Sequence, residues 1–541
     1  MPPTALTLFV ILFAASAVLG LRPAYDPSLG QGALNAVLGS AFLYLAISLL
    51  ARTTAAARAV GALVALAGGV FALYFISQFA YHNYPDTPAL IERLGNQTTF
   101  LPPIWLMYLH PNGVATLLEV LLPLAAALFV SSRRSLVIRV LCAFVIVVML
   151  YAVFLTFSRG AWIGLGAAAV LAAALALASR LPRGLATAAI VVIVALVAGG
   201  VVFVLAGGIE RLPFLQSTVA AAESRLTLYR NALYLASDYA YTGIGLGDTF
   251  AMVYSRYSLL IFVPFLTYAH NLFLAVWLGQ GLLGLVALAG IVITFYALVA
   301  RITRRAAPDA LFHGAWLGVT ATLVHGLTDS RQYIESPWAM PALFIALALA
   351  AALGRLALRE QPFERPRLAA RLAVPVVIGA AAVVAALALN VPLRALWATN
   401  QGAVDETRAE LAPGLDETQR AELQESAIRH YQAALALDPG QPNASRRLGN
   451  LYVALERYDE AVPLLEKAAA AEPDYPGAVK GLGLAYVWVG RTDEAAQTLA
   501  RLDNRRDIVN ELYTWSTFQG EQNRPDLAAY ARETADRLDR L

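Results

Sequence analysis

The sequence predicts an all-α protein in two parts, a polytopic membrane helix bundle followed by a C-terminal α-helical repeat solenoid. The first observation is composition: 59% of the 541 residues are hydrophobic and 14% are charged, with a mean hydropathy of +0.60. Soluble globular domains carry about a quarter charged residues, so this composition indicates a membrane protein. The second observation is a series of long apolar runs in residues 1–393, and the third is an internal repeat near the C-terminus.

The apolar runs predict about eleven membrane spans, because roughly 20 apolar residues cross a hydrocarbon core of about 30 Å. The first run has no basic segment before it, and we interpret it as a retained span. Glycines 279, 281 and 284 favour a kink in the long run at 271–300, or a first part above the bilayer. The runs lie near 4–21, 33–51, 57–79, 112–131, 135–157, 160–179, 184–208, 271–300, 311–328, 338–357 and 371–393.

Arginines cluster in alternate loops, which predicts the orientation in the membrane. By the positive-inside rule these loops are cytoplasmic, so the N-terminus is inside and the C-terminal part is outside the cytoplasmic membrane. The loop at 209–270 then also lies on the outer, periplasmic side. The clustered arginines are Arg52 and Arg58; Arg133 and Arg134; Arg180 and Arg183; Arg301, Arg304 and Arg305; and Arg355, Arg359, Arg365, Arg367 and Arg371.

Charge divides the chain into two domains. Residues 401–541 contain 24 Asp/Glu and 16 Lys/Arg, a net charge of −8, whereas residues 1–400 have a net charge of +11. We expect a membrane domain at 1–393, a linker at 394–420 and a repeat domain at 421–541. Cys142 is the only cysteine, which excludes disulfides and cysteine metal sites.

The C-terminal part repeats with a period of 34 residues, which is the tetratricopeptide period of one helical hairpin per repeat. Residues 500–541 are interpreted as a degenerate capping repeat. Such arrays bind peptides or proteins along a concave face, so a protein partner is expected there; the alternative is a spacer or packing module. The repeated positions are Pro439 and Pro473, Leu448 and Leu482, Gly449 and Gly483, Tyr452 and Tyr486, and D-E-A at 459–461 and 493–495.

The long polar interval at 209–270 is the candidate site, because a lipid-facing segment could not carry its charges cheaply. It holds Arg225, Arg230, Asp248 and His270. The predicted topology brings further polar groups from distant segments to the same face. They are His110, Asn112, Arg159, Asn271, His325, Asp329 and Arg331, with Glu119 two turns inside a span.

Each of these residues also has a structural interpretation. Arg159 could extend to lipid phosphates, Arg225 and Arg230 could form a solvated helix face, and His270 could be an interfacial histidine. Glu119 is either a functional intramembrane acid or the partner of a nearby arginine. The run G-I-G-L-G at 243–247 follows no strand, so we interpret it as a turn rather than a nucleotide loop.

An ordered set of motifs resembles the O-antigen ligase family and its O-antigen polymerase relatives over about residues 100–335. The motifs are H-P-N-G-V-A at 110–115, F-S-R-G-A-W at 157–162, S-R-L-T-L-Y-R-N-A-L at 224–233, A-H-N-L-F-L at 269–274, G-L-L-G-L at 281–285 and H-G-L-T-D at 325–329. The resemblance implies a C-type glycosyltransferase that moves a glycan from undecaprenyl pyrophosphate to an acceptor hydroxyl. It implies pyrophosphate binding by Arg159 and Arg225 and a base role for His270; Arg230 is added on spacing alone.

This chemistry suits the residues. A histidine titrates in the range needed to accept a hydroxyl proton. Guanidinium groups bind phosphate oxygens in paired hydrogen bonds and stay charged in a partly dry site. The outer loops show no D-x-D pair and no His/Asp metal spacing, so the sequence predicts a metal-independent reaction without a cofactor.

Several alternatives stay open at this point. Within the enzyme class these are an O-antigen or exopolysaccharide polymerase and a protein O-oligosaccharyltransferase, with a lipid, a glycan or a protein as acceptor. A lipid-linked glycan transporter would carry polar residues through both halves of its spans, and here they gather on one face. A membrane scaffold that presents a repeat domain would give the 209–270 loop no role. No nucleic-acid partner is expected.

Overall fold

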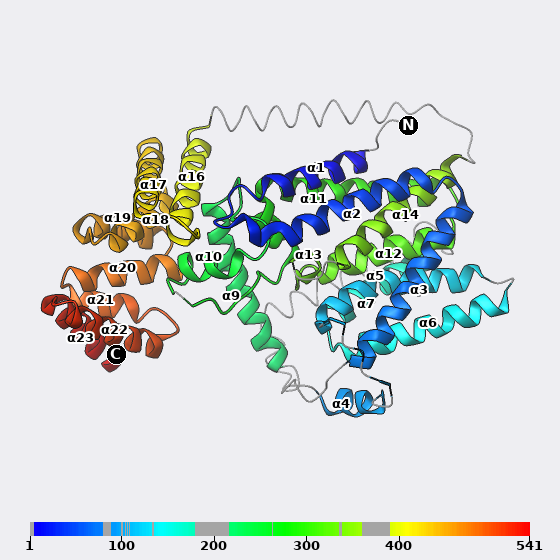
Figure 1. Ribbon diagram of the computed structural model, residues 1–541, viewed down its shortest axis with the longest axis horizontal. Helices are drawn as coiled ribbons and strands as arrows, with labels where there is room; N and C mark the ends of the chain where they lie inside the picture. Colours follow the sequence, from blue (N-terminus) through cyan, green and yellow to red (C-terminus); the bar gives the residue numbers. More distant parts are fainter. Residues whose placement is uncertain are drawn as a thin grey trace.

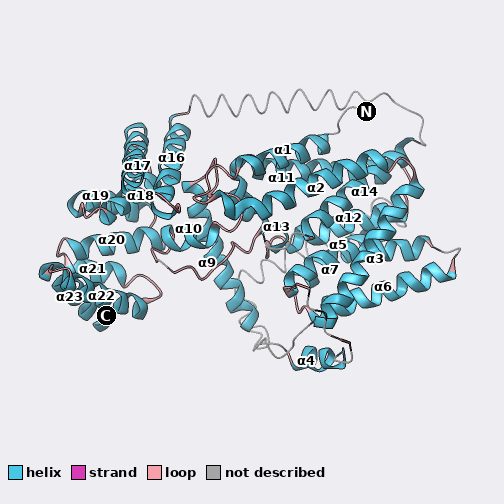
Figure 2. Cartoon of the chain, viewed as in Figure 1, coloured by secondary structure: helices cyan, strands magenta, loops and turns pink. Residues whose placement is uncertain are grey.

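The computed structural model describes residues 5–78, 88–98, 101–102, 104, 106–107, 109–132, 135–178, 216–261, 263–334, 338–359 and 390–541 (Figure 1). The regular elements in these residues are all helical (Figure 2), as the composition predicted. In the first part they are α1 (Ala5–Leu19), η1 (Pro27–Gly30), α2 (Gln31–Leu50), α3 (Thr54–Gln78), α4 (Ala89–Gly95), η3 (Asn96–Thr98), α5 (Pro111–Ser131), α6 (Leu136–Leu155), α7 (Arg159–Ala178), α9 (Gln216–Asp238), α10 (Phe250–Tyr257), α11 (Leu272–Arg305), α12 (Ala310–His325), α13 (Arg331–Ile334) and α14 (Ala339–Arg359).

Six of the described helices are long and apolar enough to cross a membrane, which makes this a multi-pass membrane protein. They are α2 with η1, α3, α5, α6, α11 and α14, and the apolar helices α1 and α7 are shorter. Large apolar side chains such as Leu63, Leu136 and Val137 point outward from them, as expected for a surface that meets lipid. The expected span at 184–208 and all but the last residues of the one at 371–393 lie outside the described residues, as do Arg133, Arg180 and Arg365. The total of eleven spans and the orientation therefore stay predictions.

Glycines let the central helices approach closely. On α12, Gly314 and Gly318 face the α5 carbonyls of Pro123 and Val120, where an added Cβ would lie 2.5 and 2.4 Å from the carbonyl oxygens. On α7, Gly164 faces the carbonyl of Ala321 in the same way, at 2.4 Å. Small residues spaced four apart are a common device for packing helices tightly in membranes. They place α5, α7 and α12 in direct contact, and these three helices carry much of the candidate site.

Helix α11 is kinked at Gly281, which confirms the interruption expected in the run at 271–300. Gly281 has φ 67° and ψ −167°, and an added Cβ would lie 2.1 Å from the carbonyl oxygen of Tyr241. The glycine-rich stretch 243–247 is a turn, also as expected. Its Ile244 amide donates to the carbonyl of Leu278 at 2.7 Å, so the turn is fixed to the first segment of α11.

The C-terminal part forms four antiparallel helix pairs. The first pair was not expected: α16 covers 394–411 of the predicted linker and packs along α17. Gly402 lies against the ring of Tyr431, whose hydroxyl donates to Glu406 Oε2 at 2.5 Å. Helix α16 lacks the repeat signature, so the 34-residue period did not reveal it, whereas α17 lies largely in the predicted repeat domain. The helices are α16 (Val391–Leu411), α17 (Glu417–Leu437), α18 (Pro442–Ala454), α19 (Tyr458–Ala471), α20 (Pro476–Trp488), α21 (Thr492–Leu499), α22 (Arg505–Glu521) and α23 (Pro525–Arg540).

The helix array lies at one end of the membrane bundle, with α9 and α10 between the two (Figure 1). Contacts join α16 and α18 to α9. Below, "the array" means residues 391–541.

Candidate active site

Hydrogen bonds from Tyr229 and Asn271 to backbone carbonyls hold His270 in place just before α11. The Tyr229 hydroxyl donates to the carbonyls of His270, at 2.8 Å, and Leu327, at 3.1 Å. Asn271 caps α11 by accepting from the amides of Phe273 and Leu274, and its Nδ2 donates to the carbonyl of Leu327 at 3.0 Å. His270 itself has φ 49°, a left-handed conformation that is unusual for a residue other than glycine. Such conformations gather at functional sites, where the surrounding contacts hold them.

The His270 ring is neutral at physiological pH. Burial lowers its pKa to about 4; Asp329 opposes this, and the cations Arg225 and Arg331 lower it further. The ring packs against Tyr268 with 4.2 Å between centroids, and its Nδ1 is buried without a hydrogen-bond partner. A neutral imidazole with an unoccupied nitrogen can accept a proton.

Asp329 connects this loop to the start of α5. Its Oδ2 accepts from Asn112 Nδ2 at 3.0 Å, and its Oδ1 accepts from the backbone amides of Ser330 and Arg331 at 2.7 and 2.9 Å. His110 caps α5, since its Nδ1 accepts from the Asn112 amide at 3.2 Å. Burial, assisted by Arg331, lowers the pKa of His110 to about 4, which keeps this cap neutral.

Glu119 and His325 form a pair inside the bundle, beneath the loops. Glu119 Oε2 lies 3.0 Å from His325 Nδ1, and both side chains are almost fully buried. His325 Nε2 lies 3.5 Å from Ser158 Oγ, and Gly160 is so close that an added Cβ would lie 2.2 Å from the His325 ring. Of the two interpretations of Glu119, the pairing one considered an arginine partner, and the partner in the structure is the histidine His325.

Arg159 begins α7 between the two residues that contact His325. Its guanidinium lies 5.6 Å from the ring centroid of Phe157, which has φ 49° and is partly exposed. The Glu119–His325 pair therefore supports the turn from which Arg159 extends. Arg331 makes a similar contact, 4.8 Å from the ring of Tyr268.

Arg225, Arg230 and His270 line one cavity of about 1080 Å³. Arg225 and Arg230 come from α9, which confirms the helix expected for S-R-L-T-L-Y-R-N-A-L. The opposite wall of the cavity belongs to the array and includes Lys480, Arg501 and Glu511. A cavity of this size is at the upper end of the range for ligand pockets, about 300–1,000 Å³.

The structure thus brings together most of the residues that the sequence singled out, in two neighbouring groups. His270, Arg225, Asp329, Arg331 and His110 influence one another electrostatically at the loops. Asp248 lies apart from them, beside Tyr25. Among the described residues no three His, Cys, Asp or Glu side chains are grouped as a metal site would need.

Sequence reasoning missed several side chains of this site. Tyr229 lies inside a quoted motif and Tyr268 directly before another, yet a tyrosine alone gave no chemical signal. Ser158 stands inside F-S-R-G-A-W and was treated only as part of a short turn. Lys480 belongs to the array, whose side chains were not expected at the cavity at all.

Comparison with known protein families agrees with the two-part architecture. The O-antigen ligase family matches residues 144–289, a range that contains Arg159, Arg225, Arg230 and His270. The tetratricopeptide repeat family matches residues 425–465 and 453–507. A comparison with curated proteins finds no match. The chain therefore carries an O-antigen ligase domain, C-terminal tetratricopeptide repeats and several candidate membrane helices.

Proposed function

We propose that this membrane protein transfers a glycan from an undecaprenyl-pyrophosphate donor to an acceptor hydroxyl on the outer face of the cytoplasmic membrane. The observation that carries the proposal is a neutral His270 facing the same cavity as Arg225 and Arg230. The match of residues 144–289 to the O-antigen ligase family supports glycan transfer as the class of reaction.

His270 acts as the base in this proposal. It takes the proton of the acceptor hydroxyl as that oxygen bonds to the anomeric carbon of the donor sugar. The bond between this carbon and the pyrophosphate oxygen breaks, and the electron pair leaves with the carrier pyrophosphate. The products are a new glycosidic bond, a protonated His270 and the free carrier, and the histidine then returns its proton to solvent.

The arginines bind the leaving group. The pyrophosphate gains negative charge as the bond breaks, and a guanidinium fixed beside it stabilises that charge in the transition state. Arg225 lies in the cavity with His270, and Arg230, five residues further along α9, lines the same cavity. Arg159 contributes from α7, supported by Ser158 and the Glu119–His325 pair. Arginine thereby takes the role that a divalent ion has in metal-dependent transferases.

The polymer profile of a deletion strain tests the proposal and separates its two closest versions. Free undecaprenyl-linked polymer identifies a ligase, and single repeat units identify a polymerase, which the family match also allows. Complementation with the native chain should restore the profile, and His270→Ala should not. His430→Ala is the matched control, because His430 is an exposed histidine of the array that pairs only with Asp405 at 3.6 Å. A deletion strain with an unchanged envelope would contradict the proposal.

The proposed orientation has its own test. The positive-inside rule places the 209–270 loop and the array on the outer side together. Reporter fusions after residue 240 and after residue 420 should both report the outside. A cytoplasmic signal at either position would contradict the orientation and the location of the site.

A further inference from the structure

The array contacts a segment of its own chain, residues 256–261, which comprises the last two residues of α10 and the loop after it. The Arg447 guanidinium lies 3.8 Å from the ring centroid of Tyr257, and the Tyr257 hydroxyl donates to Glu410 at 3.0 Å. Lys480 Nζ donates to the carbonyl of Leu260 at 3.0 Å. These array residues belong to α16, α18 and α20, the first helices of their pairs. The face where such arrays bind peptides is therefore occupied by the chain itself.

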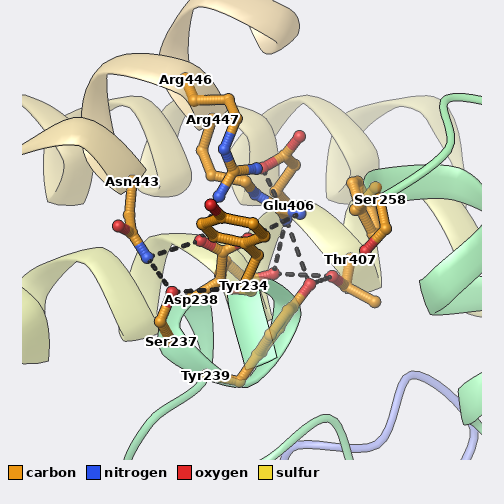
Figure 3. A network of polar contacts seen from close by, with 12 residues as sticks. Tyr234, Ser237, Asp238, Tyr239, Ser258, Glu406, Thr407, Asn443, Arg446 and Arg447 are labelled. Carbon is orange, nitrogen blue, oxygen red and sulfur yellow. Dashed lines mark hydrogen bonds and ion pairs between the residues drawn. The ribbon is translucent and has the colours of Figure 1, made fainter. Parts of the chain in front are cut away.

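Beside this segment, buried ion pairs join the array to the end of α9 and join its helices to one another (Figure 3). Arg446 Nη2 lies 2.6 Å from Asp238 Oδ1 at the end of α9, and both side chains are fully buried. Asn443 donates to the same Asp238 oxygen at 2.9 Å, and Arg447 lies 2.8 Å from Glu406. Breaking such a pair strands a buried charge, which is strongly unfavourable. An external peptide that displaced residues 256–261 would have to break the contacts of Tyr257 with Arg447 and Glu410 and that of Leu260 with Lys480.

What remains open is the cavity beside the segment, and its two walls differ in charge. The α9 wall carries Arg225 and Arg230. The array wall carries more carboxylates than cations, with Lys480 already paired to Glu511 at 2.7 Å. An acidic wall repels a pyrophosphate, whereas carboxylates and amides hydrogen-bond to sugar hydroxyls. The polar residues of the array wall are Asp474, Lys480, Arg501, Asp503, Asn504, Asp507 and Glu511.

A second observation also indicates a polar ligand. Asn231 lines the same cavity and is 3% exposed, and its Oδ1 is buried without a hydrogen-bond partner. His270 lines the same cavity, and its Nδ1 is likewise buried without a hydrogen-bond partner. Buried polar atoms are almost always paired, so two unpaired ones on residues that line one cavity favour a polar ligand that pairs with them when it binds.

We propose that the array wall, which includes Asn504 and Asp507, binds sugar hydroxyls of the acceptor, so that the acceptor is a glycan rather than a protein. This inference rests on the proposed function, since His270 defines where the acceptor hydroxyl lies. The repeat domain is then a fixed part of the active site that selects the acceptor.

Photocrosslinking in cells tests this without knowledge of the acceptor's structure. The probe is the full chain with p-benzoylphenylalanine in place of Asn504, an exposed residue where the change leaves the array core intact. Asp526, exposed on α23 and outside the cavity, is the matched control position. We expect a product at position 504 that is sensitive to periodate and contains sugar. A crosslink to a second protein, or no product above the control, would overturn the inference.

A kinetic test adds a readout that a structural role would not change. With glycolipid extracted from the deletion strain as acceptor, Asn504→Ala with Asp507→Ala should raise the acceptor KM by about three- to tenfold per lost hydrogen bond. Donor binding should stay unchanged, and Asp526→Ala should behave as the native chain. An unchanged acceptor KM contradicts the inference. If His270→Ala abolishes transfer but Asn504→Ala with Asp507→Ala leaves the acceptor KM unchanged, only the role of the array wall is rejected. If His270→Ala transfers at the native rate, the proposed function itself is rejected.

Discussion

Glu119 and His325 meet inside the helix bundle, with 3.0 Å between Glu119 Oε2 and His325 Nδ1, although 206 residues separate them. The pair is buried, and His325 reaches Ser158 on its other side. Glu119→Ala should lower stability by about 3–5 kcal/mol, because it leaves His325 buried without its partner. The thermal midpoint of the purified protein in detergent measures this.

The exposed Glu92 on α4 provides the control for that experiment, and Glu92→Ala should leave the midpoint unchanged. Replacing both members, as in Glu119→Leu with His325→Phe, should recover part of the loss, because no charge is then stranded. A Glu119→Ala midpoint equal to the native one would show that the pair does not hold the helices together.

Asp238 and Arg446 are expected to hold the array against α9. Asp238→Ala removes the nearest carboxylate of Arg446 and leaves this arginine buried, which should lower stability by about 3–5 kcal/mol. The array should then detach from α9 and become sensitive to protease. Asp493→Ala removes an exposed partner of Arg537 and should cost about 0–1 kcal/mol. Limited proteolysis of both variants compares them, and equal cleavage would contradict the docking role of Asp238.

The fold class and most helices followed from the sequence because apolar runs and the 34-residue period are local signals. The kink at Gly281 and the turn at 243–247 followed for the same reason, since glycine marks unusual backbone conformations. Helix α16 was missed because it pairs with α17 without repeating the signature residues. Its packing depends on tertiary contacts, such as Gly402 against the ring of Tyr431 and Ser426 donating to Asp405, that leave no periodic signal.

The site was predictable only in part. The motifs named His270 and Arg225, but the polarity of the wall opposite them comes from residues more than 200 positions away, such as Lys480. Likewise, sequence could suggest that Glu119 needed a partner without showing that the partner is His325. Both relationships depend on how helices pack in three dimensions.

The reaction is expected to proceed without a divalent metal. Transfer from a purified lipid-linked donor should survive EDTA, because Arg159 and Arg225 stabilise the leaving pyrophosphate in the proposed mechanism. The assay compares glycan transfer before and after chelation. Complete loss that magnesium or manganese restores would mean that carboxylates bind a metal, with Asp248 and Asp329 the first to be replaced.

The pH dependence of transfer should reflect the low pKa of His270. Burial lowers this pKa from 6.5 to about 4, so the free enzyme holds a neutral base throughout the neutral range. The apparent kcat/KM should stay level as pH falls through 6.5 and decline only near pH 4. Because the pKa of His270 is lower in the folded than in the unfolded protein, the unfolded chain protonates at higher pH. The free energy of unfolding should therefore also fall as pH decreases from 6.5 to about 4.

Two substitutions should move the pH at which kcat/KM declines in opposite directions. Arg331→Gln removes a cation that lowers the pKa of His270, so the decline should move to higher pH. Asp329→Asn removes the anion that raises it, so the decline should move to lower pH. Shifts in the same direction, or a native decline centred at the ordinary histidine pKa, would contradict the assignment of His270 as the base.

The arginines should differ in their importance for transfer. Arg159→Ala and Arg225→Ala should each raise the barrier by about 2–4 kcal/mol, the cost of losing one fixed charge-stabilising donor. Arg225→Lys should recover only part, since lysine keeps the charge without the paired geometry. Arg230→Ala should be milder, because Arg230 is exposed within the cavity. Glycan transfer and donor binding are measured together, with the exposed Arg429→Ala as control.

The double variant Arg159→Ala with Arg225→Ala decides whether the two arginines bind one pyrophosphate. Arg159 extends from α7, next to the residues that contact His325, whereas Arg225 lies on α9 at the cavity. If one leaving group contacts both, the effect of the double variant should differ from the sum of the single effects by about 0.5–3 kcal/mol, as for residues that share a partner. Strict additivity would mean that they act on separate groups, and Arg159 would then have to be assigned to another part of the donor.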